Sequence, residues 1–310
     1  MITRIAVVAF NTYREAVRAR ILHGLFAVAL ATAAYALVVG AFANRAQLRA
    51  VSDLGAASLS VYGILVAVVL GASSLYRELE LKTIFPILAR PIHRTEYLLG
   101  KYLGIVLTVT VFATANTGAL LLAVAQLSGN STWLPAGVGL ASVAAAGLVG
   151  WRFPRLRTAA PTVWATLLLV LGLLLATGAP DDRRVLWASL VLTICEVGIV
   201  TGIALFFAAF SSPFLTAIFT LGVFLVGRSA DTLASMPSRL FGETVRSAAE
   251  LVSRVVPNLM LYVPERPLLT GEAASAPLLP YVAMAATHAF AWAVALLAVA
   301  SVVFRRRDFL

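Results

Sequence analysis

Long apolar runs constrain this chain more than any other feature of its sequence. Stretches of roughly twenty predominantly apolar residues are long enough to cross the ~30 Å hydrocarbon core of a bilayer as helices. Such runs lie at 22–43, 57–75, 102–126, 134–151, 159–179, 185–210, 213–229 and 279–304. The chain is 61% hydrophobic and only 12% charged, whereas a soluble domain is about a quarter charged. We therefore predict an all-α polytopic membrane protein with six to eight transmembrane helices.

The run at 134–151 is the weakest of these candidates, because Pro135 and several glycines lower its hydrophobicity. It fits either a complete span or one half of a re-entrant hairpin. An even number of spans, six or eight, returns the end of the chain to the side on which it began.

Residues 1–21 are predicted to form an amphipathic helix that lies in the headgroup layer. Ile5 and Val17 fall on one side at helical spacing, while Arg14 and Arg18 stand one turn apart. Basic side chains at this depth anchor a helix to the membrane surface.

The distribution of charge predicts the orientation of the spans. Four segments on one side, 1–21, 76–101, 152–157 and 305–310, carry 15 Lys/Arg against five acidic residues. The segments on the other side carry nine Lys/Arg against eight acidic residues. Because cytoplasmic loops hold the excess of Lys/Arg, both termini and residues 76–101 are predicted to be cytoplasmic. The net charge of +10 is explained by this topology, so a nucleic-acid partner is not needed.

The segment from Tyr76 to Gly104 is the one long charged stretch between two apolar runs. Its two prolines, Pro86 and Pro91, interrupt helical backbone, so the sequence predicts a helix, a break and a second helix. Such an element at a membrane face is either a docking surface or a solvated loop. Pattern alone does not decide between them.

The string Glu-Leu-Glu-Leu-Lys-Thr-Ile at 78–84, followed by Leu-Ala-Arg-Pro-Ile-His-Arg-Thr-Glu-Tyr-Leu-Leu-Gly-Lys-Tyr-Leu-Gly at 88–104, resembles the intracellular segment of ABC-2 type permeases. These are the membrane subunits of ATP-binding-cassette transporters. The resemblance covers about thirty residues tightly and most of the chain loosely. It implies that residues 76–101 contact a cytoplasmic ATPase subunit. The coupling residues it implies are Glu78, Glu80, Lys82, Thr83, Arg90, Pro91, Arg94, Glu96 and Lys101.

The same resemblance implies an N-terminal elbow helix and a second permease copy, identical or related, beside this one. It also implies a permease of an inner or plasma membrane, most consistent with an exporter. The run of 134–183 departs from the family's usual six spans by adding two.

Residues 230–278 form the longest stretch between apolar runs and are predicted to lie outside the cytoplasm. From 238 to 256 they carry an apolar stripe. Charged residues four apart, such as Glu250 and Arg254, are spaced to pair on the opposite side. We expect this amphipathic helix to lie on the outer surface, and Pro257 to end it.

Glu196 is the one acidic residue predicted deep within a span. A charge there costs at least ~3 kcal/mol on insertion scales, so it must face protein or water, or be protonated. One hypothesis is a hydrogen bond between helices, with Asn116 in the third span as partner. The other is a proton site or a polar pathway.

Several enzyme and cofactor classes are excluded by missing motifs. The dipeptide Gly100-Lys101 suggests an ATP-binding Walker A loop, but that motif requires Gly at 95 and Ser or Thr at 102. The chain has Thr95 and Tyr102 there. The sequence contains no H-E-x-x-H motif and a single cysteine, Cys195. We expect no enzyme activity, metal or bound cofactor in this chain, with ATP hydrolysed by a partner subunit.

The leading prediction is therefore the permease subunit of an ABC transporter. One alternative is a related membrane subunit that transmits force in a motility or envelope complex without moving a substrate. The other is a secondary transporter driven by an ion gradient, which predicts charged pairs within the membrane. The apolar spans contain no residue pattern that identifies a substrate.

Overall fold

The computed structural model describes residues 2–43, 46–80, 93–129, 133–153, 157–235, 243–271 and 277–306. Within these ranges the chain is helical apart from short connections, and no strand occurs. The elements in chain order are α1 (Ile2–Arg18), α2 (Arg20–Phe42), α3 (Gln47–Glu80), α5 (Arg94–Leu127), α6 (Leu134–Arg152), α7 (Ala160–Leu175), η3 (Ala176–Gly178), α8 (Pro180–Ala208), α9 (Pro213–Arg228), α10 (Ala230–Ala234), α12 (Glu243–Val255), η4 (Met260–Tyr262), α13 (Arg266–Thr270) and α14 (Leu278–Arg306).

Seven helical segments in the described part of the chain are long and apolar enough to cross a membrane. They are His23–Phe42, Gln47–Ser74, Arg94–Leu127, Leu134–Arg152, Ala160–Gly178, Pro180–Ala208 and Leu278–Arg305. This confirms the prediction of an all-α polytopic membrane protein. Both 134–152 and 160–178 are long enough for complete spans, so the hairpin between them does not need to be re-entrant.

The run at 213–229 is the exception to the predicted spans. It forms α9, which has only 16 residues and is about 24 Å long at ~1.5 Å per residue. This length falls short of the ~30 Å hydrocarbon core. The prediction that 213–229 crosses the bilayer by itself is therefore wrong.

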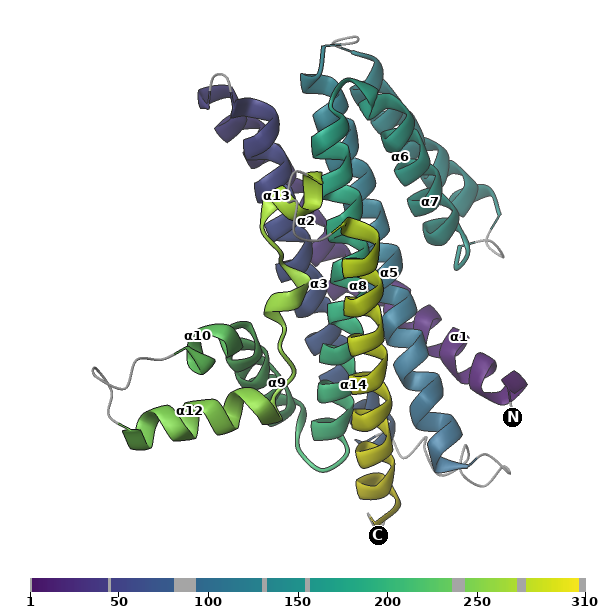
Figure 1. Cartoon of the computed structure of the whole chain (residues 1–310). Helices are drawn as coiled ribbons and strands as arrows, with labels where there is room; N and C mark the ends of the chain where they lie inside the picture. The colour runs from purple at the N-terminus through teal and green to yellow at the C-terminus, as the bar shows by residue number, and fades with distance from the viewer. Residues whose placement is uncertain are drawn as a thin grey trace.

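Both ends of the described chain lie at one end of the helix bundle (Figure 1). The Arg94 side chain, in the first turn of α5, donates to the carbonyl oxygens of Phe304 and Arg305 in α14. Helix α1 packs on the next turns of α5, against Gly100 and Gly104. We call this end the terminal end, and the end where α3 and α8 begin the distal end.

Helices α3, α5 and α8 form the centre of the bundle (Figure 1). Helices α3 and α8 run parallel and very close together. A Cβ atom added at Gly71 would lie 2.5 Å from the Cβ of Ala204. Helix α5 runs antiparallel to α3, so that Gly55 faces Leu120. The core is built from their apolar side chains, including Leu59, Leu120 and Leu192, each 0% exposed.

The chain between α9 and α14 returns to the distal end without a continuous helix, in addition to the seven long apolar helices. The N–H of Leu259 donates to the carbonyl oxygen of Gly227 at 3.0 Å, which fixes the start of this stretch beside the end of α9. Residues 260–270 then run along α8 to the distal end, where Arg266 contacts Asp53 and Asp182.

The predicted amphipathic helix exists as α12, Glu243–Val255, and its Glu250–Arg254 pair is present at 2.6 Å. Its position differs from the expectation. Helix α12 lies beside the bundle near the end of α9, and does not cover the distal end (Figure 1). The reason is that α9 stops partway along the bundle, so the residues that follow it begin there.

Candidate functional site

Three side chains from three helices form a hydrogen-bonded cluster in the interior of the bundle. Glu196 of α8 is 0% exposed, and it accepts from Arg228 at the end of α9. Arg228 Nε donates to Glu196 Oε1 at 2.8 Å, and Nη2 donates to Oε2 at 2.9 Å. Ser60 of α3 donates to Glu196 Oε2 at 3.0 Å and accepts from Arg228 Nη2 at 2.6 Å. We call Ser60, Glu196 and Arg228 the central cluster.

The central cluster gives Glu196 the compensation that a buried charge requires. The bidentate contact of a guanidinium with a carboxylate is among the strongest charge-assisted geometries. The Arg228 guanidinium carbon also lies 5.5 Å from the centre of the Phe224 ring, a favourable cation–π distance. The cluster joins α3, α8 and α9 at one point, so it fixes where the short helix α9 ends.

This arrangement corrects the hypothesis that Glu196 pairs with Asn116. Asn116 is 0% exposed, and neither its side-chain nitrogen nor its oxygen has a hydrogen-bond partner among the described residues. Sequence reasoning missed Arg228 because it stands at the end of the 213–229 run and was counted among the nine Lys/Arg on the other side of the membrane. The available signal was the length of that run. A helix of sixteen residues does not span the bilayer. A charged residue at the end of such a helix therefore lies within the bilayer.

A second polar cluster lies at the distal end, between α3, α8 and α13. Arg266 of α13 contacts Asp53 of α3 and Asp182 of α8. Ser52 donates to Asp182 at 2.7 Å and accepts from Arg266 at 2.9 Å. Burial lowers the pKa of the Arg266 guanidinium, but hydrogen bonds to Asp182 and Asp53 and their charges raise it more, so its pKa is raised. We call Ser52, Asp53, Asp182 and Arg266 the distal cluster.

The first turns of α5 form a third polar site, at the terminal end. Arg94 Nη1 donates to the carbonyl oxygens of Phe304 at 3.3 Å and of Arg305 at 2.8 Å. These carbonyls belong to the last turns of α14, where backbone oxygens lack partners within the helix. The ring of Tyr97 stacks on Phe304 with centroids 6.3 Å apart. The start of α5 is therefore fixed to the end of α14.

The same turns of α5 are fixed to α1 by close backbone approach. A Cβ atom at Gly104 would lie 2.5 Å from the carbonyl oxygen of Ala9, and one at Gly100 would lie 2.6 Å from the Cβ of Val8. Only glycine permits this distance. The four-residue spacing of Gly100 and Gly104 is the G-x-x-x-G pattern that indicates such a close helix contact.

Two ion pairs flank that contact. Arg4 lies 3.9 Å from Glu96, and Glu15 lies 3.8 Å from Lys101. The two α5 side chains are almost fully buried, with Glu96 5% and Lys101 1% exposed. We call residues 93–104, with their contacts to α1 and α14, the base of α5.

The predicted coupling residues divide into two groups. Arg94, Glu96 and Lys101 lie at the base of α5, where all three contact other helices of the same chain. Glu96 and Lys101 are buried against α1, so their side chains are not exposed at the surface of this chain; the coupling role of these residues stays a prediction. Glu78 and Glu80 lie in the last turn of α3, but the structure does not describe their side chains. Four predicted residues lie outside the described residues: Lys82, Thr83, Arg90 and Pro91.

The clusters contain arginine, carboxylate and hydroxyl groups, which hold neighbouring helices together through charge-assisted hydrogen bonds. Within the described ranges, no group of three or more His, Cys, Asp or Glu side chains is placed to hold a metal ion.

Comparison with known proteins gives no family assignment, since no protein-family model and no curated protein matches the chain.

Proposed function

We propose that this chain is the permease subunit of an ABC transporter, with a separate ATPase bound at the terminal end. The observation that carries the proposal is the combination of a family-like segment at 78–104 with a rigidly fixed base of α5. Two copies of the chain, or two related chains, would enclose the route for an exported substrate.

The lengths of α3 and α5 support a docking face at the terminal end. Each helix has 34 residues and is about 51 Å long at ~1.5 Å per residue. This exceeds the ~30 Å hydrocarbon core by about 20 Å. Charged residues stand at both ends of α3, with Arg77, Glu78 and Glu80 in its last turn, and Arg94 and Glu96 stand in the first turn of α5. The end of α3 and the start of α5 therefore lie outside the hydrocarbon in this proposal.

The base of α5 supplies a physical path for coupling. A partner that moves residues 81–92 displaces the start of α5. Because Arg94 is bonded to α14, and because Gly100 and Gly104 contact α1, those helices must follow or lose their contacts. In this mechanism Glu96 and Lys101 transmit the movement from inside the chain, without contacting the ATPase.

The excess of Lys/Arg at the terminal end supports a cytoplasmic position for that end. The test is cysteine labelling in sealed, oriented membranes. A cysteine at Arg14 in α1 and one at Trp133 near the distal end should react with an impermeant reagent from opposite sides. Reaction of both from the same side contradicts the orientation.

Purification of the tagged chain from its native membranes tests the partner. We expect an ATPase subunit with a Walker A motif to co-purify and to be identified by mass spectrometry. Arg90→Glu should reduce its recovery, because a docking surface depends on charge complementarity. The matched control is Arg246→Glu on the exposed side of α12, which should leave recovery unchanged. An intact chain that captures no ATPase contradicts the proposal.

The central cluster favours a second candidate, a transporter driven by a proton gradient. Glu196 and Arg228 form a charged pair within the bundle, as that class predicts. The chain alone, reconstituted in vesicles with a pH-sensitive dye, distinguishes the two. The ABC proposal predicts no proton flux. Flux that is abolished by Glu196→Gln would favour the second candidate.

A further inference from the structure

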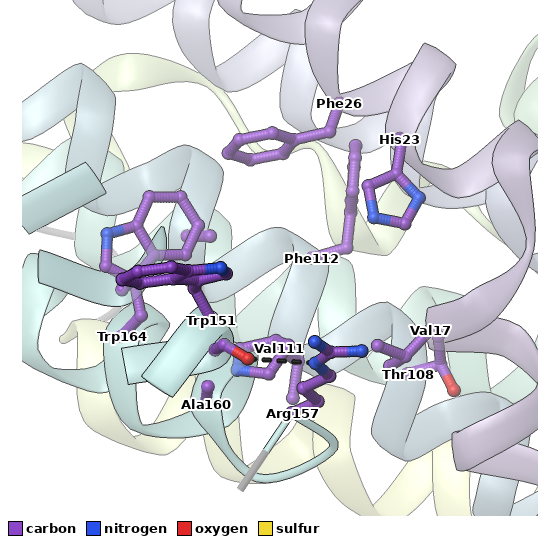
Figure 2. Close-up of a pocket in the computed structure, with 14 residues that line it drawn as sticks. Val17, His23, Phe26, Thr108, Val111, Phe112, Trp151, Arg157, Ala160 and Trp164 are labelled. Carbon is purple, nitrogen blue, oxygen red and sulfur yellow. Dashed lines mark hydrogen bonds between the residues drawn. The ribbon is translucent and has the colours of Figure 1, made fainter. Parts of the chain in front are cut away.

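A cavity of about 500 Å³ opens between the α6–α7 hairpin and the rest of the bundle. Figure 2 shows the side chains that line it. Helices α1, α2, α5, α6 and α7 all contribute to its wall. Most of the wall is apolar, and four aromatic side chains dominate it: Phe26, Phe112, Trp151 and Trp164.

The polar side chains of the cavity lie on the side opposite the tryptophans. Figure 2 shows Trp151 and Trp164 on one side, and His23, Thr108 and Arg157 on the other. Arg157 is exposed, and its Nε donates to the carbonyl oxygen of Gly150 at 2.8 Å. This bond holds the guanidinium at the mouth of the cavity and leaves its Nη groups directed away from Gly150.

The chain segments that meet at this mouth are strongly basic. Among the described side chains, the end of α1, the end of α6 and the turn before α7 carry Arg14, Arg18, Arg152 and Arg157. The one acidic residue among them is Glu15, and it pairs with Lys101. A positive cluster at the membrane surface attracts anionic headgroups, by about 1 kcal/mol for each Lys or Arg near the surface.

The apolar part of the cavity continues along the hairpin. A second cavity of about 480 Å³ lies between α2, α5, α6 and α7 toward the distal end. Phe26 and Trp164 line both cavities. They meet edge to face, with ring centroids 5.6 Å apart. The two cavities thus form one apolar path, divided by a pair of aromatic rings.

A path of this kind needs an apolar occupant. Protein interiors are packed without large voids, and an apolar cavity does not hold water. Helix α6 is loosely packed, because only 6% of its most apolar stretch is buried against the rest of the chain. The path is therefore open to the side. Hydrocarbon chains are the apolar groups available beside a membrane-spanning helix.

We propose that the cavity at Arg157 is a binding site for an anionic phospholipid. The headgroup phosphate binds the Arg157 guanidinium at the mouth, and Thr108 and His23 lie beside it. One acyl chain packs between Phe112 and Trp164 and continues toward the second cavity. The site requires only that the chain is embedded in a bilayer, so it does not depend on the ATPase partner.

Quenching of Trp164 fluorescence by brominated phospholipids tests the site. The chain has five tryptophans, and replacing the other four with Phe leaves Trp164 as the only reporter. In bilayer nanodiscs, brominated phosphatidylglycerol should bind about fivefold more strongly than brominated phosphatidylcholine, which corresponds to ~1 kcal/mol for one arginine contact. Arg157→Gln should remove this preference. The matched control is Arg246→Gln on the exposed side of α12, which is remote from the cavity and should keep the preference.

A second variant tests whether the acyl chain enters the cavity. Ala146 lines the wall, and Ala146→Phe should fill it and reduce quenching by both lipids. Equal quenching by the two lipids that Arg157→Gln does not change would overturn the headgroup assignment. Absence of quenching by either lipid would show that another group, such as a second copy of the chain, covers the cavity. If Ala146→Phe does not fold, the comparison of Arg157→Gln with Arg246→Gln still tests the headgroup assignment.

Discussion

Two Arg–Glu pairs of the same chemistry lie in opposite surroundings in this molecule. In the central cluster, the side chains of Glu196 and Arg228 are 0% and 21% exposed. On α12, the side chains of Glu250 and Arg254 are 45% and 74% exposed. Both pairs have short contacts, 2.8 Å and 2.6 Å, so contact distance alone does not distinguish them.

The difference between the pairs lies in what happens when one partner is removed. Water replaces the missing partner on α12, but no water is available to a carboxylate in the bundle interior. A buried pair therefore restrains the fold strongly even where it adds little net stability. The central cluster makes the positions of α3, α8 and α9 depend on one another, whereas the α12 pair affects only its own helix.

The largest expected effect is that of Glu196→Leu. It leaves the Arg228 charge buried without its partner, which costs about 3 to 5 kcal/mol in known cases. We expect loss of monodisperse protein in detergent and a clearly lower melting temperature. The double variant Glu196→Leu with Arg228→Leu should recover most of this loss, because an apolar pair of similar volume is tolerated. A double variant as unstable as the single one contradicts this account of the central cluster.

Packing at the base of α5 should give the next largest effect. Gly104→Leu places a side chain against the Ala9 carbonyl oxygen and Thr12. Overpacking of this kind costs about 1 to 3 kcal/mol and should separate α1 from α5. The matched control is Gly147→Leu in α6, where nothing lies within 4 Å of an added Cβ. The melting temperature should fall for Gly104→Leu alone, and equal falls would show that the hairpin is as tightly packed as the base.

The distal cluster is intermediate in exposure between the central cluster and the α12 pair. Arg266 is 18% exposed, and its partners Asp182 and Asp53 are 10% and 45% exposed. Arg266→Ala should cost about 1 to 3 kcal/mol, the usual penalty for leaving a buried acceptor unsatisfied, since Asp53 is partly hydrated. The measured melting temperature should lie between those of Glu196→Leu and the α12 variant. A loss as large as that of Glu196→Leu would mean that exposure does not rank these pairs.

The smallest expected effect is that of Arg254→Ala. Exposed pairs four residues apart on a helix contribute only about 0.3 to 0.5 kcal/mol. Thermal unfolding should be unchanged within error at physiological salt. A marked loss would show that a partner or a second copy of the chain buries α12.

Much of the fold follows from the sequence because apolar length and helical periodicity act locally. The amphipathic helix at the N-terminus, the long apolar spans and the Glu250–Arg254 pair were all predicted. The end of α9 was not, because it depends on a contact between Ser60, Glu196 and Arg228, which lie far apart in the sequence. The need of Glu196 for a partner was evident, but the identity of that partner required the bundle.

The candidate site was predictable to a similar extent. The spacing of Gly100 and Gly104 predicted a close helix contact, but it did not name α1 as the partner helix. The family resemblance named Glu96 and Lys101 as coupling residues, but nothing in the sequence indicated that another helix of the same chain covers them. Their burial arises because α1 folds back over α5 and supplies Arg4 and Glu15. A one-dimensional pattern does not contain that information.

Photo-crosslinking from the terminal end tests the central claim most directly. A photoreactive amino acid replaces Arg90, between α3 and α5, and a control replaces Trp133, which is 82% exposed near the distal end. After irradiation of native membranes, the proposal predicts an adduct between position 90 and an ATPase subunit, and none from position 133. An inserted, intact chain that forms no ATPase adduct at position 90, or forms it equally at position 133, would contradict the assignment as an ABC permease.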